Sequence, residues 1–280
     1  MLRFVVSLFL AFAALAGMPA HAQFPTASVI HVSLVGEQES IAPGQEFWVG
    51  VQFHMEEGWH IYWINPGDSG EPPRVQWHLP AGFQAGEFQW PHPERLVTKY
   101  SVDYGYADQM LLLAPIRPPA GLAPGGKSEL AATVKWVVCR EVCIPGKTEV
   151  ALSIPVKRSA APQSSKLFED ARKRIPQPAP AHWRARARQE KDAFVLSLET
   201  GQPIAQAEFF PLLPQQVENA APQAAIALPR GVRLRLKMSE QLLKPIANLK
   251  GVIVLPSGKA YLIDAPVTGA GARDSKIKKG

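Results

Sequence analysis

The stretch VKWVVCREVCIPG, residues 134–146, decides how this chain folds, and it holds the two cysteines of the sequence, Cys139 and Cys143. Apolar and polar residues alternate before the pair, in residues 133–138, and again after it, in residues 150–156. This alternation is typical of half-buried β-strands. We therefore expect the cysteines to bracket a turn that joins two strands.

The spacing of the cysteines limits what the pair can do. Residues four apart in a fully extended chain lie roughly 13 Å from each other, which is too far for a disulfide. A tight turn through residues 140–142 brings the Cα atoms within the roughly 4.4–6.8 Å that a disulfide needs. Such a bridge closes a loop of about five residues, which stabilises a fold by only about 2 kcal/mol, against about 4.7 kcal/mol for a 100-residue loop. The short loop favours a reversible redox pair.

The first 22 residues have the pattern of a secretory signal peptide. Arg3 supplies the positive start, residues 4–15 are apolar, and residues 20–22 form a small-x-small cleavage site. No later uncharged apolar run reaches 18 residues, so the mature chain is not expected to be embedded in a membrane. Export to an oxidising compartment allows cysteines to pair.

Composition and periodicity predict an all-β protein. The chain contains 27 prolines and 21 glycines, and few segments have a helical period. Seven or more strands are expected before residue 158, a number that indicates an immunoglobulin-like β-sandwich. Residues 232–238 alternate most clearly in the remainder, which we expect to form a second, smaller β-sandwich domain.

The expected organisation is two β domains joined by a linker. In order, the segments are a signal peptide (1–22), the immunoglobulin-like domain (23–158), a basic proline-rich linker (159–182), the second β-sandwich domain (183–268) and a disordered basic tail (269–280). Within the linker, Ser164 or Ser165 is expected to cap a short helix through residues 166–174. The net charge of the chain is +6, and residues 157–191 alone carry +7. We interpret this basic stretch as a solvated linker, because export separates the chain from nucleic acid.

Two local motifs suggest other chemistries, and their contexts disfavour both. Residues 67–70, GDSG, resemble the nucleophile motif of chymotrypsin-like proteases, but no aspartate precedes Asp68. His54, Met55 and His60 could bind Cu(I) together with the cysteines. His54 and Met55, however, point to opposite faces of one strand. We predict no metal site and no cofactor.

Three motifs give the sequence a resemblance to a known family. They are residues 58–67 (GWHIYWINPG), residues 106–109 (YADQ) and above all residues 136–145 (WVVCREVCIP). Together they resemble the periplasmic N-terminal domain of the DsbD family of thiol:disulfide interchange proteins, in particular its copper-sensitivity-suppressor, ScsB-like branch. The resemblance covers about residues 26–158 and, more loosely, about residues 183–267.

The resemblance implies roles for individual residues. Cys139 and Cys143 would be the redox pair, joined as a disulfide when oxidised, and Cys143 would carry the mixed disulfide. His60 and Tyr62 fall where the family has aromatic residues near the pair, and residues 93–100 fall near the loop that caps it.

A second loop is a candidate shield for the cysteines. Asp68 and Glu71 lie in it, and His60 lies close to it in sequence, so we expect these residues to shield or support the pair. A thiol pair in an oxidising compartment needs such protection, because exchange requires access to sulfur.

The resemblance also implies partners. They are a membrane electron carrier of the DsbD/ScsB type and periplasmic thioredoxin-fold proteins, with no nucleic acid among them. Full-length members contain the carrier and a thioredoxin-like domain, and this sequence contains neither, so we expect it to act with separate partners.

The sequence therefore predicts a periplasmic thiol–disulfide exchange protein, a component of a protein-disulfide reductase system. It would relay reducing equivalents to partner proteins through its CxxxC pair. The alternative is a non-catalytic periplasmic β-sandwich that binds a partner protein or copper and holds a structural disulfide.

Overall fold

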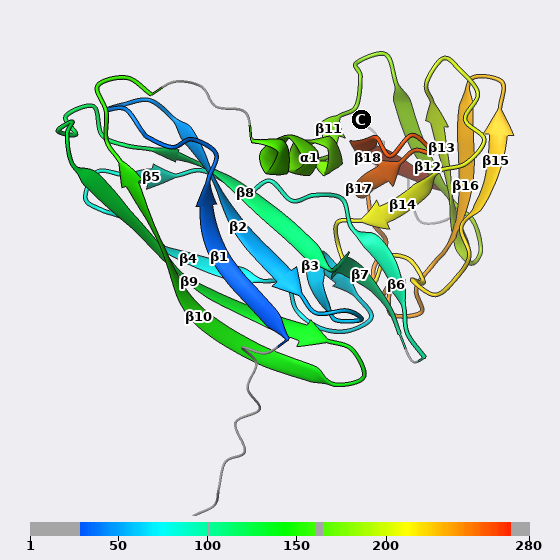
Figure 1. The fold of residues 1–280 in the computed structure, drawn as a ribbon. Coiled ribbons are helices and arrows are strands. Elements are labelled where there is room, and N and C mark those ends of the chain that lie inside the picture. The colour runs from blue at the N-terminus through cyan, green and yellow to red at the C-terminus, as the bar shows by residue number, and fades with distance from the viewer. Residues whose placement is uncertain (1–28, 100, 161–164, 270–280) are drawn as a thin grey trace, which may run out of the picture.

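The computed structural model describes residues 29–99, 101–160 and 165–269, which form two β regions connected through one helix (Figure 1). The expected signal peptide lies outside the described residues. So does the expected tail, apart from Gly269, which ends the last strand. Within the described part of the chain, no helix is long and apolar enough to cross a membrane.

The first β region is a sandwich of two sheets. One sheet has the strand order β1 (Ile30–Gly36), β2 (Phe47–Met55), β8 (Gln109–Arg117) and β5 (Gln84–Ala85). The other has the order β10 (Cys143–Pro155), β9 (Lys127–Cys139), β3 (His60–Gly67), β7 (Val102–Ala107) and β6 (Glu94–Val97), with β4 (Arg74–His78) also paired to β9. The mostly-β, immunoglobulin-like fold expected from the sequence is confirmed.

Strand alternation explains how the two sheets come to share a core. On β2, Phe47, Val49, Val51 and Phe53 are buried and point toward the other sheet. Side chains along a strand point alternately to opposite faces, so the residues between them face outward. The same rule holds on β9, whose even-numbered residues face the core, so its odd-numbered residues, including Cys139, lie on the outer face of the sheet.

The β9–β10 hairpin is the longest paired element of the first region. Its register runs from the pair Lys127–Pro155 to the pair Cys139–Cys143 without a shift. Residues 140–142 form the turn, in which the Arg140 backbone N–H donates to the Val142 carbonyl at 3.2 Å. The turn predicted between the two cysteines is confirmed.

Helix α1 (Lys166–Arg174) packs against the first region. Phe168 is buried between the helix and Leu111 and Leu113 of β8. The guanidinium of Arg172 binds the Glu37 carboxylate. The helix lies where the sequence predicts it, and Ser165 precedes it without a side-chain capping bond. The helical part of the segment that we interpreted as a solvated linker is therefore docked on a sheet.

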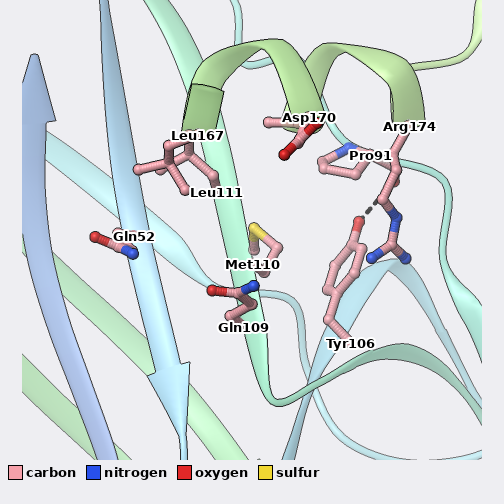
Figure 2. Close-up of a pocket in the computed structure, with 10 residues that line it drawn as sticks. Gln52, Pro91, Tyr106, Gln109, Met110, Leu111, Leu167, Asp170 and Arg174 are labelled. Carbon is pink, nitrogen blue, oxygen red and sulfur yellow. Dashed lines mark hydrogen bonds between the residues drawn. The ribbon is translucent and has the colours of Figure 1, made fainter. Parts of the chain in front are cut away.

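A small cavity remains beneath this helix (Figure 2). It has a volume of about 120 Å³ and lies between α1 and the start of β8. Tyr106 borders it and donates its hydroxyl proton to the Pro91 carbonyl at 2.7 Å. Its lining includes neither cysteine.

In the second β region, one strand pairs with three others. β18 (Ala260–Gly269) pairs with β17 (Asn248–Val254) through its first part and with β12 (Arg184–Gln189) through its last three residues. The remaining strands are β11 (Gln177–Pro178), β13 (Ala193–Glu199), β14 (Glu208–Pro211), β15 (Ala224–Leu228) and β16 (Gly231–Lys237). Their inward side chains form a separate hydrophobic cluster.

The two regions also share buried contacts. Phe210 of β14 is 1% exposed and packs edge-on against Tyr104, with ring centroids 5.2 Å apart, and against Trp63, at 6.4 Å. The buried Asn65 side chain donates from Nδ2 to the Pro211 carbonyl at 2.7 Å. The second region is thus joined to β3 and β7 by hydrophobic packing as well as by chain connectivity.

We expect Phe210→Ala to lower the free energy of unfolding by about 3–5 kcal/mol, because it removes an aromatic ring from a fully packed site. Urea unfolding followed by circular dichroism measures this loss. Leu243→Ala is the control, because Leu243 is 89% exposed and its removal should change stability by less than about 0.5 kcal/mol. Similar losses in both variants would contradict the shared core.

Candidate redox site

Four residues stand in one row across the second sheet. Cys143 on β10 pairs with Cys139 on β9, Cys139 pairs with His60 on β3, and His60 pairs with Ala107 on β7. Paired residues on neighbouring strands place their side chains on the same face of a sheet. The cysteines and His60 therefore share the outer face, and the register alone brings His60 to the pair.

The two cysteines form a disulfide across the end of the hairpin. Their Cα atoms lie 4.2 Å apart, close to the separation of directly opposed residues in an antiparallel pair. Cys139 is only 2% exposed, whereas Cys143 is exposed to solvent. A partner molecule can therefore approach the bridge from the Cys143 side.

Tyr62 places a hydroxyl group beside the exposed sulfur. Its side chain is fully buried, and its oxygen lies 3.7 Å from Cys143 Sγ and 3.4 Å from Ser69 Oγ. Burial raises the pKa of the Tyr62 phenol; the contact with Ser69 opposes this rise and the nearby Asp103 carboxylate adds to it. Tyr62 therefore remains a neutral hydrogen-bond donor at physiological pH.

Asp103 is the buried acid of the site, at 1% exposure. Its Oδ1 accepts hydrogen bonds from the backbone N–H and the hydroxyl of Ser69, both at 3.0 Å, and its Oδ2 accepts one from the Ser101 hydroxyl. His60 Nε2 lies 3.8 Å from Oδ2, beyond hydrogen-bond length. Burial opposes ionisation, but the His60 ring and the serine bonds outweigh it, so the pKa of Asp103 is lowered. Asp103 is a fixed negative charge.

A bulge in β3 brings the loop of residues 68–70 onto Asp103. The β3–β7 register shifts between Tyr62 and Gly67, so the chain between them leaves the ladder. The loop that follows turns back over the outer face. The Gly70 backbone lies directly on the Tyr62 ring, and a Cβ atom built at Gly70 would stand 2.0 Å from Tyr62 Cζ. Only glycine fits here, since φ is also +74°.

The structure brings a serine, a histidine and an aspartate together, yet not as a protease triad. Ser69 Oγ donates to Asp103 and not to His60. A triad requires the histidine between the other two, to accept the serine proton. Gly67 and Gly70 both have positive φ values, so the GDSG motif forms a turn.

Asp68 is bound to the backbone of β7, Glu71 pairs at the surface, and His54 lies in the other sheet. Asp68 accepts a bond from the Val102 backbone N–H through Oδ2 at 2.8 Å, two residues before Gly70, which lies on the Tyr62 ring. Glu71 pairs with Arg74 at the exposed surface. His54 is exposed on β2, in the opposite sheet, which separates it from the cysteines and from His60.

Of the segment expected near the cap, residues 93–100, the described residues 93–99 form β6 and the start of the β6–β7 turn. Tyr100 lies outside the described residues. The turn closes through the Thr98 backbone N–H, which donates to the Ser101 carbonyl at 2.9 Å. Ser101 in turn binds Asp103, so this segment reaches the site through the buried acid.

Sequence reasoning missed Asp103, Ser69 and Gly70 as parts of the site. The alternation of Asp103 with the inward-facing Tyr104 and Tyr106 could have shown that Asp103 faces outward on β7. No sequence signal could have shown that the β3 bulge carries Ser69 onto it, because that contact joins residues 34 positions apart.

Residues 28–155 match the family model for the N-terminal domain of the thiol:disulfide interchange protein DsbD. The crystal structure of the N-terminal periplasmic domain of ScsB from Proteus mirabilis is similar, with 15% identity, a TM-score of 0.66, and coverage of 88% of this chain and 96% of that one. The reduced N-terminal domain of Neisseria meningitidis DsbD aligns at 18% identity over 47% of this chain and 90% of its own, with a TM-score of 0.31. No curated protein matches. The ScsB likeness shows that both β regions recur together as one fold.

We expect Gly70→Ala to destabilise the protein more than Gly258→Ala. Both glycines have positive φ, at +74° and +78°, so alanine strains either backbone by about 1 kcal/mol. Only at Gly70 does the new methyl group collide with the Tyr62 ring, whereas Gly258 has open space around it. Thermal unfolding of the two variants measures the difference. Equal melting temperatures would show that the loop does not rest on Tyr62.

Proposed function

Residues 28–155 belong to the family of DsbD N-terminal domains, and from this premise we propose that the protein exchanges disulfides with partner proteins through Cys139 and Cys143. The observation that carries the proposal is the asymmetry of the bridge. Cys143 is exposed and has a phenol hydroxyl beside its sulfur, whereas Cys139 is buried. One sulfur can therefore be attacked while the other leaves.

The first half of the cycle reduces the bridge. A thiolate of the electron donor attacks Cys143 Sγ, which forms a mixed disulfide and expels Cys139 as a thiolate that then takes up a proton. The second thiolate of the donor attacks its own sulfur in the mixed disulfide and releases Cys143. The donor leaves as a disulfide, and the Cys139–Cys143 pair has gained two electrons.

The second half passes these electrons on. The Cys143 thiolate attacks the disulfide of the acceptor protein, and one acceptor sulfur leaves as a thiolate. Cys139, after losing its proton, attacks Cys143 Sγ, which re-forms the bridge and releases the second acceptor sulfur. The bridge returns to its starting state, and the acceptor is reduced by two electrons.

Tyr62 is suited to assist both halves. The Ser69 hydroxyl proton is committed to Asp103, so Ser69 Oγ can only accept from Tyr62 in the oxidised protein. When the bridge opens, the Cys143 thiolate becomes the stronger acceptor, because hydrogen bonds to charged groups are roughly twice as strong. We infer that the phenol proton then turns toward Cys143 and stabilises the thiolate.

The partners proposed from the family are a membrane electron carrier of the DsbD/ScsB type and thioredoxin-fold proteins, and the compartment is the periplasm. The oxidising environment there makes a guarded thiol pair necessary. In this chain the two sulfurs are protected unequally: Cys139 is buried, whereas Cys143 faces solvent. The exposed side is the route by which we propose that partners dock.

We expect Cys139→Ser, in which Cys143 has no resolving thiol, to form a stable mixed disulfide with an oxidised thioredoxin-fold protein. Non-reducing electrophoresis detects the adduct, which dithiothreitol should remove. Cys143→Ser is the matched control and should form little adduct, because the remaining Cys139 is buried.

The reduction potential of the bridge tests the same proposal independently. A redox pair that exchanges with glutaredoxin-like or isomerase-like partners should have a potential of about −230 to −180 mV. A potential below about −300 mV, together with no adduct from Cys139→Ser, would mark a structural disulfide in a binding module and overturn the proposed exchange.

We expect Tyr62→Phe to slow alkylation of reduced Cys143 by iodoacetamide about tenfold at pH 7, the cost of a hydrogen bond to a charged acceptor. The thiolate is the reactive form, so its loss of stabilisation lowers the reactive fraction. The difference should vanish in strongly alkaline solution, where the thiol is ionised in both proteins. A rate equal to that of the wild type at pH 7 would exclude Tyr62 as the donor.

A further inference from the structure

One side chain of the second β region reaches the loop that covers Tyr62. Asn219 Nδ2 donates to Asp68 Oδ1 at 2.7 Å, and Asn219 Oδ1 accepts a bond from the Tyr104 hydroxyl at 2.9 Å. The Arg95 guanidinium donates to the Asn219 backbone carbonyl. Asn219 therefore ties the second region to β6, β7 and the loop after β3 at a single point.

Backbone contacts within the second β region hold the chain next to Asn219 in place. Val217 forms a bridge with Met238, and the Glu218 backbone N–H donates to the Lys237 carbonyl at 2.8 Å. Lys237 ends β16, which is paired on both sides, with β13 and β15. Burial of Phe210 in the first region holds the two bodies together near this point. Asn219 thus projects from a supported backbone and is not a freely moving surface residue.

The residue that Asn219 binds is the direct chain neighbour of the redox site. Asp68, which Asn219 binds, also accepts a bond from the Val102 backbone N–H and is followed directly by Ser69. Ser69 binds Asp103 and contacts the Tyr62 hydroxyl, and Gly70 lies on the Tyr62 ring. A shift of Asp68 must therefore move the groups that orient Tyr62.

We propose that Asn219 is a positioning residue for the cysteine pair: the second β region uses it to hold the loop of residues 68–70 in place, and so keeps the Tyr62 hydroxyl directed at Cys143. This inference rests on the proposed exchange function. It gives the second region a defined role, which is to set the reactivity of a sulfur in the first region. Asn219 touches neither sulfur and acts only through Asp68, Ser69 and Tyr62.

Asn219→Asp is the single substitution that tests the contact with Asp68 most directly. The aspartate keeps an oxygen to accept the Tyr104 bond, but it loses the donor to Asp68 and places a second carboxylate beside it. Like charges repel each other, so the loop should leave its position. We expect alkylation of reduced Cys143 by iodoacetamide to slow about threefold. This loss is smaller than that of Tyr62→Phe, because the hydrogen bond from Tyr62 to Cys143 is weakened and not removed.

Two further variants separate positioning from general damage. Asn248→Asp is the matched control, because Asn248 Nδ2 also donates to an aspartate, Asp264, elsewhere in the second region. It should leave the alkylation rate unchanged. The exchanged pair Asp68→Asn with Asn219→Asp restores a donor and an acceptor across the contact, and it should restore the rate.

A double variant tests whether Asn219 acts on Cys143 through Tyr62. In a Tyr62→Phe background, Asn219→Asp should slow alkylation no further, because the group that it positions is gone. A rate for Asn219→Asp equal to that of Asn248→Asp, a failure of the exchanged pair to restore the rate, or an additional loss in the Tyr62→Phe background would each overturn the inference.

The outcomes distinguish this inference from the function on which it rests. If Cys139→Ser forms no adduct and the bridge has a structural potential, the exchange function fails whatever Asn219 does. If the adduct forms and Tyr62→Phe slows alkylation while Asn219→Asp does not, the exchange function stands and only the role of Asn219 is lost. Thermal unfolding of each variant confirms that the proteins compared are folded.

Discussion

Backbone pairing of β9 with β10 and with β3 is the constraint on which the site depends. The hairpin register places Cys139 directly opposite Cys143, and the contact with β3 places His60 beside Cys139. A register slip of one residue would turn every one of these side chains to the other face of the sheet. The buried side chains of β9, such as Leu130 and Val134, prevent such a slip because it would expose them. The hydrophobic core therefore fixes the position of the sulfurs.

The contacts that hold Tyr62 beside Cys143 come from irregular backbone and not from the regular strand ladder. The β3 bulge after Tyr62 lets the chain fold back over its own outer face, and this return carries Ser69 to Asp103. A buried carboxylate is costly unless it is hydrogen-bonded, and Asp103 has three such bonds from two serines. Asp103 therefore holds the loop, and the loop holds Tyr62 beside Cys143. The bulge in β3 thus brings the residues around Cys143 together.

The second β region is a structural part of the redox unit. Phe210 fills space between Trp63 and Tyr104, and Asn65 satisfies its buried amide with the Pro211 carbonyl. Both Trp63 and Asn65 lie within the bulged segment of β3, the same segment that leads into the loop over Tyr62. Packing against the second region therefore stabilises the irregular conformation that the site requires. A bulge of this length facing solvent would lack that support.

By itself the sequence determined the mostly-β, immunoglobulin-like fold, the turn between the cysteines, the helix at residues 166–174 and the family resemblance, because these follow from period-2 alternation, helix signals and contiguous motifs. It pointed to Cys139, Cys143, His60 and Tyr62 for the same reason: they lie in such motifs. Only the tertiary structure decided that Asp103 and Ser69 meet beside Tyr62, that Asn219 reaches Asp68, and that the basic linker segment docks as a helix. These contacts join residues far apart in the chain, and their partners are selected by burial and packing, which no local pattern encodes.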